Sequence, residues 1–135
     1  MIALDLAREL KVAGLPWRPR RGDLAMDRLN DLFVVLRDGS DDAGGVLIDT
    51  PQGAERKHFL MLTWIPRLDQ LLAALARYGP CSLCGLPAGE GRRDVRWRLT
   101  LSGGAATPEA AGPFEGSDPA DAAGKALHHL LTRTA

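Results

Sequence analysis

The chain has 135 residues, a length that suits one domain, and no metal or disulfide is needed to stabilise a core of that size. Its 17 basic and 17 acidic residues cancel, which excludes a global positive field of the kind that draws proteins onto nucleic acid or anionic lipid. Charged residues interrupt the first ten positions, and no apolar run approaches the roughly 18 residues of a membrane span. We therefore expect a cytoplasmic protein without membrane contact.

The first half of the chain predicts one helix followed by a three-stranded antiparallel meander. Apolar residues recur at helical spacing over residues 2–13, and Gly14 supplies a helix stop. The segment "PWRPRRGD" predicts that residues 16–31 are mostly loop, with at most one short strand. β-branched, aromatic and alternating apolar residues then predict strands over 32–37, 46–49 and 56–64.

The second half predicts a helix, one clear strand and a final helix. Pro66 is placed to open a helix that ends at Gly79, and residues 94–101, "DVRWRLTL", alternate without interruption between apolar and polar residues. A short edge strand is expected at 114–115, and Ser117 or Asp118 is expected to cap the last helix. The predicted fold is a single α+β domain over residues 1–135. It has an antiparallel sheet of about four to five strands and three helices in the order α-β-β-β-α-β-(β)-α.

Cys81 and Cys84, the only cysteines, have the spacing of a metal knuckle within the expected loop "YGPCSLCGLPAGEG". Zinc needs further ligands, and the candidates are His58, alone or with one of His128 and His129, carboxylates such as Glu90 and Asp94, or the knuckle of a second chain. His128 and His129 are adjacent on a helix and point about 100° apart, so they do not form a pair on one ion. The alternatives are ordinary loop thiols without a cofactor, a zinc or other soft-metal site, and a redox dithiol, for which the usual position at a helix start is missing.

A second pattern, "DGSDDAGGVLID", places Asp38, Ser40, Asp42 and Asp49 at positions of a calcium-loop template. Ala43 occupies the position that the template reserves for glycine, and the flanking segments are predicted strands. The sequence therefore favours a solvated hairpin turn here.

Two arginine clusters surround tryptophans, as in proteins that bind single-stranded nucleic acid. The clusters are Arg18, Arg20 and Arg21 beside Trp17, and Arg92, Arg93, Arg96 and Arg98 beside Trp97. Strand alternation sends Trp97 to the face opposite Arg96 and Arg98, which favours a solvated sheet face. Binding of a polyanion would require that the two clusters lie side by side.

Four sequence blocks carry a resemblance to known proteins. The blocks "LARELKVAGLPWRPRRGD", "WIPRLDQLLAAL", "DVRWRLTL" and "PADAAGKALHHLL" resemble, in this order, small uncharacterised bacterial proteins of actinobacterial and Deinococcus type. The last strand and helix also look like phage-encoded domains of the αβα-sandwich kind. The resemblance implies a fold and a bacterial or mobile-element setting, and it implies no activity.

No pattern in the sequence has the spacing of a nucleophile elbow, a phosphate loop or a dinucleotide fingerprint. We therefore predict a non-enzymatic binding or accessory domain that acts through protein–protein contacts, either with a partner protein or as a homo-oligomer. Trp17 and Trp64 are its candidate interface residues. A zinc-binding protein and a polyanion- or nucleic-acid-binding protein are the alternatives.

Overall fold

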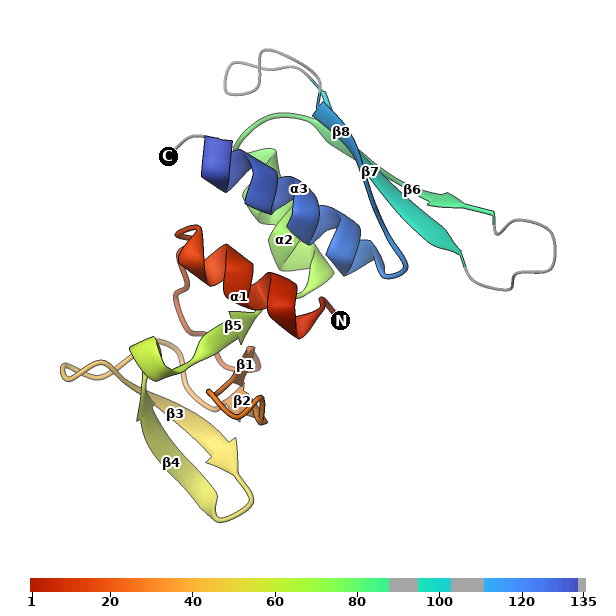
Figure 1. The fold of residues 1–135 in the computed structure, drawn as a ribbon. Helices are drawn as coiled ribbons and strands as arrows, with labels where there is room; N and C mark the ends of the chain where they lie inside the picture. Colours follow the sequence, from red (N-terminus) through yellow and green to blue (C-terminus); the bar gives the residue numbers. More distant parts are fainter. Residues whose placement is uncertain (88–94, 103–110, 134–135) are drawn as a thin grey trace. The chain divides into compact units, whose positions relative to one another are not determined.

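The computed structural model describes residues 1–87, 95–102 and 111–133. Three helices and two antiparallel sheets, of five and three strands, confirm the predicted α+β class and the order of its elements (Figure 1). Internal contacts divide the chain into two units, here called unit 1 (residues 1–14 and 67–135) and unit 2 (residues 15–66). Each unit is described by itself, and the organisation as one domain stays a prediction.

Unit 2 is a five-stranded sheet in the spatial order β4-β3-β2-β1-β5. All of its neighbouring strands pair antiparallel. The strands are β1 (Leu24–Met26), β2 (Leu32–Val35), β3 (Gly45–Thr50), β4 (Gly53–His58) and β5 (Thr63–Ile65), and the 3-10 turn η1 (Phe59–Met61) lies between the last two.

The single strand predicted over 56–64 is wrong, because η1 divides it into β4 and β5. The physical reason is topological: β4 and β5 occupy opposite edges of the sheet, so the chain has to leave one edge before it can pair at the other. His58 fixes the turn, since its Nδ1 accepts the backbone N–H of Leu60 at 3.1 Å. The short strand allowed for within residues 16–31 is β1.

One face of this sheet holds the core of unit 2, a cluster of buried side chains against which Trp17 packs. Its members are Ala25, Phe33, Val35, Val46, Ile48 and Leu62. Burial of apolar surface of this kind is the main favourable term in folding. Asp23, which is 2% exposed, accepts hydrogen bonds from Trp17 Nε1 and from the Arg20 N–H, each at 3.0 Å, and so fastens the loop before β1.

Unit 1 combines three helices with a three-stranded sheet in the order β6-β7-β8. Its elements are α1 (Leu4–Val12), α2 (Leu68–Ala76), β6 (Cys81–Leu86), β7 (Arg96–Leu101), β8 (Ala111–Gly116) and α3 (Pro119–Arg133). The helix α3 contacts α1, α2, β7 and β8, and Figure 1 shows it between the other two helices and the sheet.

Helix α3 approaches α1 closely because Gly124 has no side chain. A Cβ atom at this position would lie 2.7 Å from Ile2 Cδ1 and 2.9 Å from Leu6 Cδ2. The predicted start of α3 is confirmed, since Asp118 Oδ1 accepts the Ala120 N–H at 2.8 Å and Pro119 is the first helical residue.

Three further expectations differ from the structure. The strands form two sheets instead of one, because α2 separates β5 from β6 along the chain and the later strands pair only among themselves. Pro66 was expected to open the second helix, but α2 begins two residues later, at Leu68. Arg67 precedes the helix, and its N–H donates to Gln70 Oε1 at 2.9 Å. The expected cysteine loop contains β6, because residues 81–86 pair with β7 along their whole length.

None of the described helices is long and apolar enough to cross a bilayer.

Candidate interaction surfaces

The two cysteines lie on β6, with Cys81 half-buried and Cys84 exposed. Residues three apart on a strand point to opposite faces, so the two thiols diverge, whereas a metal knuckle needs both on one side. Burial also raises the pKa of the Cys81 thiol, which disfavours the thiolate that a metal binds. No group of three or more His, Cys, Asp or Glu residues able to hold a metal occurs within the described residues, and the zinc site stays a prediction.

His58, the predicted third ligand, has a structural place in unit 2. Its Nδ1 accepts the Leu60 N–H, and its ring stacks on Phe59 with centroids 4.8 Å apart. The ring also lies against Gly44, where a Cβ atom would be 2.5 Å from Nε2. These contacts support the interpretation of His58 as a turn-stabilising residue.

Two carboxylates of the calcium-template segment, those of Asp38 and the neighbouring Asp41, make contacts within the protein. Asp41 Oδ1 accepts the N–H groups of Ala43 and Gly45, and its Oδ2 lies 3.5 Å from the Arg56 guanidinium. Asp38 Oδ1 accepts the Arg21 N–H at 2.8 Å. The turn is therefore stabilised by backbone donors and an arginine, as expected for a solvated hairpin.

The predicted arginine clusters lie in different units. Arg18, Arg20 and Arg21 belong to unit 2, Arg96 and Arg98 lie on β7 in unit 1, and Arg92 and Arg93 lie outside the described residues.

On the open face of β7, Glu115 of β8 accepts from Arg98 at 2.9 Å and lies 3.6 Å from Arg96. One carboxylate therefore offsets part of the charge of two guanidinium groups. Leu99 and Leu101 are buried on the opposite face and Trp97 is half-buried, as the predicted alternation requires, whereas Val95, which precedes the strand, is 45% exposed. Polyanion binding stays a prediction.

The two tryptophans named as interface residues stack on each other within unit 2. Their ring centroids are 6.4 Å apart and the planes differ by 9°. Both side chains are half-buried, and Trp64 Nε1 is buried without a hydrogen-bond partner among the described residues. Their part in an interface stays a prediction, and more exposed apolar surface lies elsewhere.

One exposed apolar surface of unit 2 follows its central strand, and the side chains of η1 form another. Leu32, Val34 and Leu36, here called the β2 strip, alternate with the buried Phe33 and Val35 and are 43%, 45% and 36% exposed. The strip continues past β2, because the Leu36 N–H donates to the Leu47 carbonyl of β3 at 2.9 Å. These three side chains lie on the face of the sheet opposite the core cluster.

The same face is buried farther along the sheet. Val34 lies opposite Leu24, which in turn lies opposite Ile65, and Leu32 lies opposite Met26. Met26 and Ile65 are 0% and 2% exposed. The β2 strip is therefore the uncovered margin of an apolar layer that is already buried at β1 and β5.

The sequence marks this strand as apolar on both faces, although it does not record whether either face is covered. Residues 32–36, "LFVVL", are apolar at every position, whereas a strand with one solvated face alternates. A continuous apolar run predicts a strand covered on both faces, so its exposure in the structure marks an uncovered surface.

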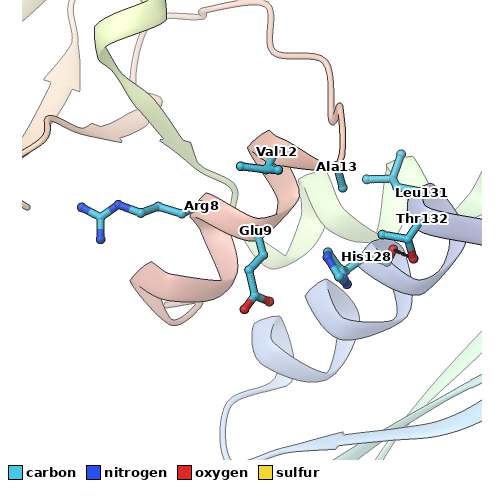
Figure 2. A pocket seen from close by; sticks show the side chains of 7 residues that line it. All are labelled: Arg8, Glu9, Val12, Ala13, His128, Leu131 and Thr132. Carbon is cyan, nitrogen blue, oxygen red and sulfur yellow. Dashed lines mark hydrogen bonds between the residues drawn. The ribbon is translucent and has the colours of Figure 1, made fainter. Parts of the chain in front are cut away.

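A second apolar surface is a groove in unit 1 between α1 and α3, with a volume of about 510 Å³. Arg8, Glu9, Val12 and Ala13 line it from α1, and His128, Leu131 and Thr132 line it from α3 (Figure 2). The Thr132 hydroxyl donates to the His128 carbonyl at 2.9 Å and to the His129 carbonyl at 3.1 Å. The single hydroxyl proton of Thr132 is thus shared between two backbone carbonyls of its own helix.

No protein-family model, curated protein or solved structure matches the chain. The resemblance to small bacterial proteins stays a prediction.

Proposed function

We propose that the protein is a binding domain without catalysis of its own, and that it acts through contact of the β2 strip with a partner protein. The observation that carries the proposal is the exposure of Leu32, Val34 and Leu36 side by side on the central strand of a sheet. A strand that is apolar on both faces is normally covered on both, because an apolar sheet face is stable only when another layer packs on it.

The shape of the surface supports an amphipathic helix as the occupant. The strip extends from Leu32 to Leu36, a distance of four steps along an extended chain or about 13 Å, which equals the length of roughly nine residues of helix. Helices are the usual second layer on a sheet, and a partner helix on the β2 strip would pack on the same sheet face as the buried Met26 and Ile65.

The edge strands of this sheet are poorly suited to pairing with another chain, which favours a contact through the sheet face. The edge strand β4 carries Glu55, Arg56 and Lys57, and charged residues on an edge strand oppose pairing with another chain. The other edge, β5, has only three residues.

Site-specific photo-cross-linking in the cells that express the protein tests this proposal. A photoreactive residue replaces Val34 in one variant and Glu55, which is exposed on the other face of the sheet, in the matched control. We expect one discrete adduct from position 34 and none from position 55. The purified partner should then bind wild-type protein at least about tenfold more tightly than Val34→Lys, the scale expected for a buried interface residue.

Three results would refute the proposal. Identical adducts from both positions would show that the contacts are nonspecific. The absence of an adduct at position 34 would show that no partner binds at the β2 strip. A partner that binds Val34→Lys as tightly as wild type would place the interface elsewhere.

A further inference from the structure

Strand β6 is a sheet edge without the usual protection against pairing. It has six residues, "CSLCGL", with no charge and no proline. The other edge of the same sheet, β8, contains Pro113 and Glu115. Natural proteins protect exposed edges with charges, prolines or short strands, so a six-residue edge that lacks all three is a candidate pairing site.

The hydrogen bonds to β7 determine which backbone groups of β6 face outward. Ser102 donates its N–H to the Pro80 carbonyl at 2.9 Å, which makes this a hydrogen-bonded pair of the ladder. Such pairs alternate along an antiparallel ladder, so Ser82, Cys84 and Leu86 also bond to β7. The backbone N–H and C=O groups of Cys81, Leu83 and Gly85 therefore point away from the sheet.

These outward groups have no strand partner in the described part of unit 1. Figure 1 shows β6 at the outer margin of the three-stranded sheet. The Gly85 carbonyl has the Cys84 thiol at 4.0 Å, and a thiol is a weak donor. A strand that pairs here would satisfy polar groups that otherwise depend on water.

We propose that two copies of the chain pair antiparallel through β6, with Leu83 on the two-fold axis. The outward residues are symmetric about Leu83. This axis places Leu83 opposite its equivalent and Cys81 opposite Gly85 of the second copy. Each of the resulting pairs exchanges two backbone hydrogen bonds, so every outward group of the strand is used.

The composition of the strand supports a second copy as the occupant. In a two-fold symmetric pair, each strand lies antiparallel to an identical strand. A charged residue near the axis would therefore lie close to the same charge on the second copy and would destabilise the pair. β6 has none. The proposed dimer uses a surface of unit 1 that is separate from the β2 strip of unit 2. The dimer and the proposed function can therefore be tested and refuted independently.

The proposed register predicts which cysteines can be cross-linked. Ser82 lies opposite Cys84 of the second copy in a non-hydrogen-bonded pair, with Cα atoms about 4.5 Å apart, within the range of disulfides. The two Cys84 residues are displaced from each other by two positions along the strands, or about 7 Å, in addition to the separation between the strands. Ser82→Cys should therefore cross-link across the axis, while the wild-type cysteines should not.

The first measurement is the solution mass of the wild-type chain over a concentration series, because an interface of this size belongs to the weak, transient class. We expect the mass to rise from 14.5 kDa toward twice that value. Leu83→Pro removes an outward N–H that plays no part in the ladder to β7, and edge strands tolerate proline at such positions. Leu83→Ala is the matched control, because it loses the same packing and keeps the N–H. We expect Leu83→Pro to stay monomeric with an unchanged circular dichroism spectrum, and Leu83→Ala to dimerise.

The second measurement is mild oxidation of Ser82→Cys followed by non-reducing electrophoresis. We expect a covalent dimer that disappears when Cys84→Ser is added. A wild-type chain that stays monomeric at every concentration would overturn the proposal, as would a Leu83→Pro variant that dimerises like Leu83→Ala. Cross-linking of wild-type protein through Cys84 alone would overturn the register with Leu83 on the axis.

Discussion

Replacing Asp23 by alanine tests whether one buried carboxylate holds the loop before β1 in place. Asp23 is 2% exposed, and its Oδ2 accepts from Trp17 Nε1 and from the Arg20 N–H, each at 3.0 Å. Trp17 packs on the core cluster of unit 2, so the carboxylate connects the loop to the core.

The magnitude follows from these two bonds. Hydrogen bonds to a charged group contribute about 1.5–3 kcal/mol each, and truncation also leaves two donors without a partner. We expect Asp23→Ala to lower the free energy of unfolding by about 3–5 kcal/mol, a large share of the 5–15 kcal/mol typical of a domain. Asp23→Asn keeps an oxygen that both donors can reach and should lose about half as much.

Urea unfolding followed by tryptophan fluorescence measures the effect, because Trp17 and Trp64 both report on unit 2. Asp42→Ala is the control, since Asp42 is exposed in a turn and its removal should change the unfolding free energy by less than about 0.5 kcal/mol. A loss below about 1 kcal/mol for Asp23→Ala would refute this prediction, because two part-buried hydrogen bonds to a carboxylate should together contribute more.

Three further predictions concern pH, packing and thiol reactivity. Burial raises the pKa of Asp27, but N–H donors from Asp31 and Leu29 and the Lys57 ammonium at 3.3 Å outweigh it, so the pKa lies below its ordinary value. The ionised Asp27 carboxylate therefore stabilises the fold above pH of about 4, and this contribution is lost as the pH falls through the lowered pKa. Between about pH 4 and 2, the free energy of unfolding of Asp27→Asn should consequently fall less than that of the wild type. Gly124→Val should lower the thermal midpoint of unit 1, as overpacking against α1 costs about 1–3 kcal/mol, and an unchanged midpoint would contradict the close approach of α1 and α3. In a thiol titration of native protein, exposed Cys84 should react faster than Cys81, whose pKa is raised by burial, and equal rates would contradict the placement of β6.

The sequence determined the elements whose residues have a strong local pattern. The alternation of "DVRWRLTL" predicted β7 and the burial of Leu99 and Leu101, because a strand sends successive side chains to opposite sides. Asp118 and Pro119 predicted the start of α3, because a cap and an N1 proline act within one turn of the helix. The α+β class followed from the order of these elements.

Only the tertiary structure decided how the strands associate. The division into two sheets, and the break of residues 56–64 at η1, depend on pairing between residues far apart in sequence, which no local pattern records. The placement of Cys81 and Cys84 was also decided by long-range pairing. Their spacing suits a metal knuckle in a loop, but residues 81–86 pair with β7 as an extended strand, so the two thiols point to opposite faces. Exposure of the β2 strip was also beyond the sequence, because whether an apolar strand is covered depends on what the rest of the chain places over it.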